Sequence, residues 1–256
     1  MSSAEDLLKE AEALIAEATK RGIILRVFGG VAIRYHCPSA RTPSLARHIA
    51  DIDLFGLSRQ SAQIKRVFAD LSYTPAETFN ALRGNKRLMF FEPKTQVRRD
   101  VFLDFFELCH KFDFRNRLQV ERFSIPITDL LMTKLQVVEI EERDYKDIVC
   151  ILIDHDLAER DTNDVVNRKH IAEMCSNDWG IYKTFTQNLE KTLRYLKEAD
   201  LNVAEKKLVQ DRINALAQAI EVFPKSSRWK VRSLIGDRMS WYEEPEAPKT
   251  IKFAEE

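Results

Sequence analysis

The sequence predicts an α+β fold, in which a mixed sheet with flanking helices is followed by a helical C-terminal domain. Over the first 125 residues, short apolar runs of strand length alternate with turn residues and with helix-like segments. From Pro126 onward, apolar residues recur at the three- and four-residue spacing of helices. We therefore expect an α/β core at residues 1–125, a helical domain at 126–223, and a partly extended C-terminal extension at 224–256.

The bulk composition indicates a soluble protein of the cytoplasm. The chain has 256 residues, 45% of them apolar and 31% charged, which is typical of globular proteins. Charges interrupt every long apolar run, so no membrane span is expected, and the acidic segment 2–9 lacks the features of a signal peptide. The four cysteines lie far apart and are interpreted as free thiols in a reducing compartment.

The chain is predicted to begin with a helix and a buried strand. Apolar residues recur at helical spacing over Ala4–Lys20, and Gly22 is a typical residue just after a helix. The apolar run Ile23–Phe28 follows and predicts a strand that is buried on both faces. A glycine pair, a short helix over Val31–His36 and a loop at 37–48 come next.

The remaining core elements are predicted from alternation, turn residues and helical spacing. They are a strand at Ile49–Phe55, a helix at Arg59–Leu71, and strands at Arg87–Phe91, Val97–Leu108 and Val120–Ile125. The segment 74–82 is ambiguous. Beyond the core, we expect helices from Thr128 or Asp129 to Glu141, then at Tyr145–His155, Tyr182–Glu198 and Val203–Val222.

A glycine pair and an aspartate pair mark the candidate site. Gly29 and Gly30 directly follow a strand, where the absence of a side chain allows close approach of a ligand, and the next helix favours an anion at its start. Asp51 and Asp53 are two residues apart, so in a strand they share one face. Their mutual repulsion is relieved by a hard divalent cation. The pattern predicts a phosphate-facing turn beside a Mg²⁺ or Mn²⁺ site.

A third acid is expected on a later strand. Asp104 lies inside the apolar run 101–106, where a carboxylate is costly unless it is paired or bound to a cation. Asp100 is the alternative, but its neighbours Arg98 and Arg99 give it an ordinary reason to lie at the exposed start of the strand. We therefore favour Asp104.

A lysine on an apolar helix face is a further candidate. Lys134 lies within the apolar stripe formed by residues such as Leu130 and Leu131. A buried ammonium group needs an anion or a path to solvent, and the structural alternative is that Lys134 extends along the helix to reach water.

These motifs resemble those of a known superfamily. Gly29-Gly30 followed by Asp51-x-Asp53 resembles the signature of the nucleotidyltransferases with the polymerase-beta-like fold. Lys134-Leu135 and the later block from Arg143 to Ile148 resemble motifs of the AbiEii-type branch, which includes abortive-infection and related toxin enzymes. The resemblance covers residues 23–155.

The resemblance implies roles for specific residues. Asp51, Asp53 and Asp104 would hold Mg²⁺, or Mn²⁺, in a two-metal arrangement. Lys134 would be the catalytic lysine, and the downstream aspartate would be Asp147 or Asp144. Gly29, Gly30, Lys134 and, from the basic loop at 37–48, Arg47 would bind the nucleoside triphosphate. The loop at 37–48 lengthens the interval between the glycine pair and the aspartate pair. We interpret this loop either as a substrate contact or as an insertion without a chemical role.

The implied activity is the Mg²⁺-dependent transfer of a nucleoside monophosphate from an NTP to an acceptor hydroxyl. The resemblance favours tRNA or another RNA as acceptor, and it implies a cognate antitoxin as partner. The first 122 residues carry 20 basic and 15 acidic residues, which suits an anionic substrate. The alternative is a catalytically inactive nucleotide-binding or scaffold protein on the same fold, and a second alternative is a structural helical protein whose Asp pair decorates the surface.

Overall fold

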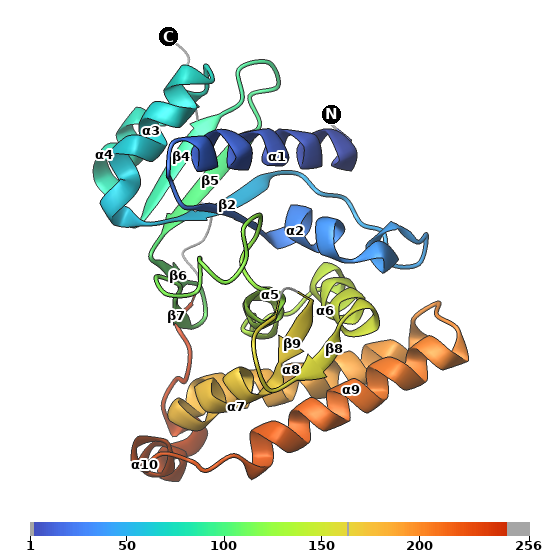
Figure 1. The fold of residues 1–256 in the computed structure, drawn as a ribbon. Helices are drawn as coiled ribbons and strands as arrows, with labels where there is room; N and C mark the ends of the chain where they lie inside the picture. The colour runs from blue at the N-terminus through green and yellow to red at the C-terminus, as the bar shows by residue number, and fades with distance from the viewer. Residues whose placement is uncertain (1–2, 163, 245–256) are drawn as a thin grey trace.

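The computed structural model describes residues 3–162 and 164–244 and confirms the predicted α+β class (Figure 1). Its central sheet has five strands in the order β1-β2-β5-β4-β3, and all neighbours are antiparallel except the parallel pair β2 and β5. The strands are β1 (Leu25–Phe28), β2 (Ile52–Gly56), β3 (Thr74–Pro75), β4 (Arg87–Phe91) and β5 (Arg98–Leu103).

Helices cover the sheet and continue the chain beyond it. Figure 1 shows α1, α3 and α4 beside the sheet, α7 to α10 at the opposite end, and α5 and α6 between these two parts. The helices are α1 (Ala4–Lys20), α2 (Gly29–His36), α3 (Ser61–Asp70), α4 (Glu77–Arg83), α5 (Ile127–Leu135), α6 (Glu142–Asp154), α7 (Arg168–Asn177), α8 (Trp179–Glu198), α9 (Val203–Val222) and α10 (Ser227–Ile235). Two small sheets complete the fold, β6 (Phe105–Glu107) with β7 (Lys111–Asp113), and β8 (Asp156–Ala158) with β9 (Val165–Asn167).

The first helix is anchored to the sheet by apolar packing and by one buried ion pair. The side chain of Ser3 caps α1, and apolar side chains such as Leu7 and Leu14 are buried against the core. The fully buried Arg99 on β5 donates two hydrogen bonds to Glu10 on α1, at 2.7 and 2.6 Å. This charge pair joins α1 to the sheet.

The predicted strand Val97–Leu108 is interrupted. Asp104 has a φ of +62°, a left-handed conformation that ends β5 and sends the chain into β6. Periodicity alone predicted an unbroken strand, because the residues on both sides of Asp104 are apolar and aromatic.

Two further boundary predictions were wrong. Residues 120–125 form no strand, because the carboxylate of Glu121 accepts hydrogen bonds from the amides of Phe123 and Ser124 and so folds the segment into a turn. One isolated bridge joins Ser124 to Val27. The helix expected to reach Glu141 ends at Leu135.

Other segments are more ordered than the sequence indicated. The ambiguous segment 74–82 contains β3 and most of α4, and part of the expected C-terminal extension forms α10. The rest of that extension, residues 245–256, lies outside the described residues. The predicted division into domains stays a prediction. Within the described ranges, no helix is long and apolar enough to cross a membrane.

Candidate active site

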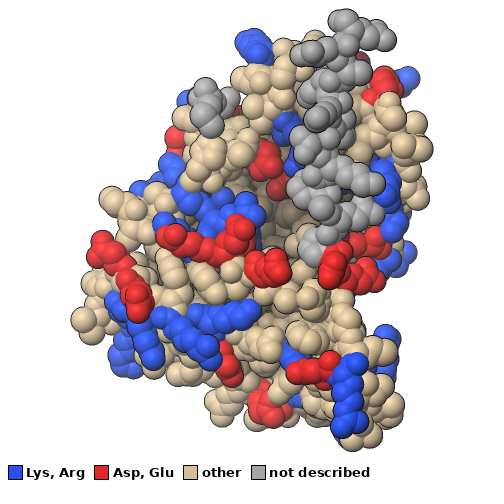
Figure 2. All heavy atoms as spheres, turned by 180° about the vertical axis from the view of Figure 1, so that it is seen from behind, with Lys and Arg blue, Asp and Glu red and all other residues tan. Residues whose placement is uncertain are grey.

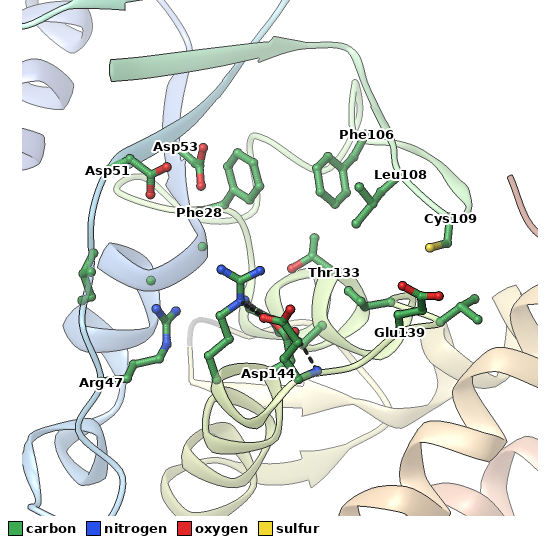
Figure 3. Close-up of a pocket in the computed structure, with 18 of the residues that line it drawn as sticks. Phe28, Arg47, Asp51, Asp53, Phe106, Leu108, Cys109, Thr133, Glu139 and Asp144 are labelled. Carbon is green, nitrogen blue, oxygen red and sulfur yellow. Dashed lines mark hydrogen bonds and ion pairs between the residues drawn. The ribbon is translucent and has the colours of Figure 1, made fainter. Parts of the chain in front are cut away.

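The candidate motifs meet in one cavity of about 780 Å³ between the sheet and the helices. It is lined by six of the predicted residues: Gly29, Gly30, Arg47, Asp51, Asp53 and Lys134. Figure 3 shows Asp51 and Asp53 side by side, with Arg47 on another part of the cavity wall, below them in this view. The face drawn in Figure 2 is hollowed near its centre, and both acidic and basic side chains gather along the edge of that hollow.

Other side chains closely approach both glycines. Gly29 opens α2 with a φ of +69°, and a Cβ there would lie 3.0 Å from Oδ2 of Asp53. A Cβ on Gly30 would lie only 2.8 Å from Nη2 of Arg47. The glycine pair therefore lets a carboxylate and a guanidinium approach the start of α2 from two directions.

The two aspartates share one side of the cavity but differ in environment. Asp53 lies on β2 and is partly buried, whereas Asp51 precedes the strand. Burial, followed by the nearby charges of Asp51 and Asp100, raises the pKa of Asp53 to about 7. Among the residues that the structure describes, none donates a hydrogen bond to the Asp53 carboxylate or forms an ion pair with it.

This donor set fits a hard divalent cation. Mg²⁺ prefers oxygen ligands and is commonly held by one or two carboxylates together with substrate phosphates. Asp53 is a carboxylate without a partner, next to a second carboxylate, and a cation there would remove the repulsion between the two. Within residues 3–162 and 164–244, no group of three or more His, Cys, Asp and Glu side chains is arranged to hold a metal ion.

Asp104 does not join this pair, so the prediction that it lies beside Asp51 and Asp53 was wrong. The parallel register pairs Asp53 with Asp100 and Gly56 with Leu103, so Asp104 follows the far end of β5. Four residues of strand separate it from Asp100, which is roughly 13 Å. Its carboxylate instead accepts hydrogen bonds from the amide and the hydroxyl of Ser58, at 2.9 and 2.5 Å.

The alternative acid, Asp100, lies beside Asp53 but is not exposed to the cavity. It is fully buried on β5. Arg87 and Arg98 both contact its carboxylate, with nitrogen–oxygen distances between 2.6 and 2.9 Å. The sequence interpretation that placed Asp100 at an exposed strand start was therefore wrong about its burial and right about its arginine neighbour.

Lys134 is part of an ion-pair cluster on α5 and α6. Its Nζ lies 2.8 Å from Oδ2 of Asp147 and 3.1 Å from Oδ1 of Asp144. Burial opposes the charged form, but the two carboxylates more than compensate and raise the pKa of Lys134 above its usual value. Asp144 and Asp147 occupy neighbouring turns of α6, so one lysine contacts both of the residues that the sequence left as alternatives.

Arg47 completes this cluster from the basic loop. Its Nε and Nη2 each donate to Asp147, both at 2.7 Å. Burial by itself would raise the pKa of Asp147, but the charges and hydrogen bonds of Lys134 and Arg47 outweigh burial and hold this pKa below its usual value. The loop itself is fixed to α6, since Asp154 accepts hydrogen bonds from the amide and hydroxyl of Ser39.

The rest of the cavity wall was not predicted. Phe28 and Phe106 form an aromatic side next to the aspartates, and their rings lie 5.3 Å apart in an edge-to-face arrangement (Figure 3). Tyr242 and Glu244 come from the end of the described chain, where the amide of Glu243 donates to the carbonyl of Cys109. No periodicity or motif in the sequence signals these contacts, because they depend on the chain returning from α10 to the β6–β7 hairpin.

Comparison with known proteins gives weak structural similarities. No protein-family model and no curated protein sequence matches the chain. A crystal structure of the lincosamide antibiotic adenylyltransferase LnuA bound to lincomycin has a TM-score of 0.40 at 12% identity, over 56% of this chain and 94% of that one. A solution structure of the antibiotic-resistance factor ANT(2'')-Ia has a TM-score of 0.37 at 10% identity, over 86% and 97% of the two chains.

A third similar structure is a tRNA nucleotidyltransferase in complex with a primer tRNA and an incoming ATP analogue. Its TM-score is 0.30 at 11% identity, and the alignment covers 87% of this chain and 59% of that one. All three TM-scores are below 0.5.

Proposed function

We propose that the protein is a Mg²⁺-dependent nucleotidyltransferase, which moves a nucleoside monophosphate from an NTP to an acceptor hydroxyl. The observation that carries this proposal is the placement of two neighbouring carboxylates, Asp51 and the unpaired Asp53, in the same cavity as two fixed cations, Arg47 and Lys134. A metal triphosphate needs both kinds of group, because its metal binds carboxylates and its phosphates bind cations and amides.

The triphosphate would lie along the start of α2. The amides of Gly29 and Gly30 are at the positive end of that helix, and neither residue has a side chain to exclude a phosphate. Arg47 lies against Gly30, and Lys134 lies near Arg47 because both contact Asp147. Asp147 would therefore be a positioning residue, since it holds both cations in place without lining the cavity.

Asp51 and Asp53 would hold the metal ion. When bound, Mg²⁺ would offset charge on the phosphates and polarise the α-phosphate. In the reaction the acceptor oxygen forms a bond to the α-phosphorus, the bond to pyrophosphate breaks, and the hydroxyl proton is released. Lys134 would stabilise the negative charge that develops on the departing pyrophosphate.

The resemblance found in the sequence extends the proposal to tRNA or another RNA as acceptor and to a cognate antitoxin as partner. Both remain predictions. The catalytically inactive alternative would bind nucleotide without releasing pyrophosphate, and it would need neither a free carboxylate at Asp53 nor a charged Lys134.

The test is incubation of the protein with each α-labelled NTP, Mg²⁺ and either total RNA or cell lysate. We expect transfer of label to an acceptor, dependent on Mg²⁺, and its loss in Asp53→Ala. The matched control is Asp113→Ala, which removes an exposed carboxylate on β7 whose hydrogen bonds and ion pair, among the described residues, are with Arg115. Undiminished labelling by a folded Asp53→Ala variant would refute the proposal, and NTP binding without any labelled product would favour the inactive alternative.

A further inference from the structure

We propose that the site holds a single divalent cation, on Asp51 and Asp53, and that Asp100 is committed to its arginine partners and is not a ligand of a second metal ion. The inference rests on the proposed function, because it concerns the metal that the proposed reaction uses. It departs from the two-metal arrangement that the sequence resemblance implies.

Asp100 is the carboxylate that a second metal ion would require. The parallel register of β2 and β5 places it directly beside Asp53, and no other acid on β5 is close to the pair. Its side chain is fully buried and does not line the cavity, in contrast with Asp51 and Asp53.

Arg87 engages both oxygens of this carboxylate. Its Nε donates to Oδ1 at 2.9 Å, and its Nη2 lies 2.8 Å from Oδ2. The contact at Oδ1 is a charge-assisted hydrogen bond, whereas Oδ2 accepts no hydrogen bond among the described residues and is held by attraction between opposite charges. The guanidinium carbon also lies 4.4 Å from the ring centre of Phe102, which is two residues after Asp100 on β5.

A second cation approaches the same carboxylate. Nε of Arg98 lies 2.6 Å from Oδ2 of Asp100, while its Nη2 lies 4.0 Å from Asp51. A divalent ion bound to Asp100 would therefore lie next to two guanidinium groups, one of them fixed by an aromatic ring. Repulsion between these like charges opposes a second metal ion at this position.

The charges of the cluster agree with one metal ion. The cluster consists of three carboxylates and two guanidinium groups, which belong to Asp51, Asp53, Asp100, Arg87 and Arg98. Among these carboxylates, Asp53 alone has no partner among the residues described. One divalent cation on the Asp51 and Asp53 side supplies the missing partner and also attracts a triphosphate.

The test counts metal ions with Mn²⁺ as the probe. Free Mn²⁺ is measured by its electron paramagnetic resonance signal during titration of the protein with one equivalent of a non-hydrolysable ATP analogue. We expect one Mn²⁺ per chain in the wild type. In Asp53→Asn the apparent Kd for Mn²⁺ should rise about tenfold or more, whereas in Asp100→Asn the count should stay at one with a change in Kd below about threefold.

A variant that lacks both arginines tests why Asp100 is unavailable. In Arg87→Gln/Arg98→Gln the carboxylate is released, and we expect a second Mn²⁺ per chain. If Asp100→Asn does not fold, the number of Mn²⁺ ions bound by the wild type and by the double arginine variant still tests the proposal. Circular dichroism checks that each variant is folded.

Two Mn²⁺ per wild-type chain, or the loss of an ion in Asp100→Asn, would overturn the proposal. A double arginine variant that still binds one ion would overturn the role given to the arginines. The labelling experiment separates this inference from the proposed function. Transfer of label with two bound ions overturns only the single-metal site, whereas an absence of both labelling and Mn²⁺ binding overturns both.

Discussion

The guanidinium of Arg47 meets the carboxylate of Asp147 in a two-point ion pair, with both nitrogen–oxygen distances at 2.7 Å. The two residues are 100 positions apart, one in the basic loop after α2 and the other on α6. Asp147 also contacts Lys134, so a single buried carboxylate holds the two cations that face the cavity.

Asp147→Asn should destabilise the protein and weaken nucleotide binding. The substitution removes the carboxylate that pairs with both partly buried cations and leaves Asp144 paired with Lys134, and breaking a buried ion pair typically costs about 3 kcal/mol. The free energy of unfolding from urea titration at pH 7 measures the first effect, and the Kd for an NTP analogue measures the second. The control is Asp211→Asn, which removes an exposed helix-surface pair with Lys207 and should change neither quantity. An unchanged unfolding free energy in Asp147→Asn would contradict the role given to this residue.

Gly29→Ala should impair metal and nucleotide binding beyond its effect on stability. The left-handed backbone at Gly29 costs any other residue about 1 kcal/mol, and the new Cβ would also lie 3.0 Å from Oδ2 of Asp53. Gly22→Ala is a matched control, because Gly22 has the same φ of +69° but a Cβ added there would meet no atom within 4 Å. Both variants should lose similar stability in urea titrations, but only Gly29→Ala should bind Mn²⁺ more weakly. Equal Mn²⁺ affinity in the two variants would show that the contact with Asp53 is unimportant.

His110 should make the protein less stable in mild acid. Burial lowers the pKa of His110 to about 4, below the value of about 6.5 expected in the unfolded chain. The unfolded state therefore binds more protons between these values, and stability falls as the pH decreases from 6.5 towards 4. Between pH 7 and pH 5 this residue alone should cost about 2 kcal/mol.

The measurement for His110 is the free energy of unfolding at pH 7 and pH 5 in the wild type and in His110→Gln. The variant loses the contact between Nε2 and the hydroxyl of Thr184, so it should be less stable at pH 7. It should nevertheless lose less stability on acidification. An identical pH dependence in the two proteins would rule out His110 as a source of acid sensitivity.

The sequence by itself determined the class of fold and the chemical character of the site. Apolar runs of strand length before Pro126 and helical spacing after it were sufficient for the α+β class, because burial of apolar faces sets these two periods. The glycine pair and Asp51-x-Asp53 were identifiable because each motif is local, so its members lie close together whether or not both aspartates belong to the strand. Lys134 was identifiable because a charge in an apolar helix stripe is unusual at any position.

The tertiary structure alone decided which distant residues meet. The choice between Asp100 and Asp104 depended on the register of β5 against β2 and on the left-handed backbone of Asp104, and neither leaves a signal in an apolar run. The burial of Asp100 against Arg87 follows from the same register, since β4 brings that arginine to the same face of the sheet. Periodicity specifies which face a side chain occupies, whereas the alignment of one strand or helix against another is fixed only when the whole core is packed.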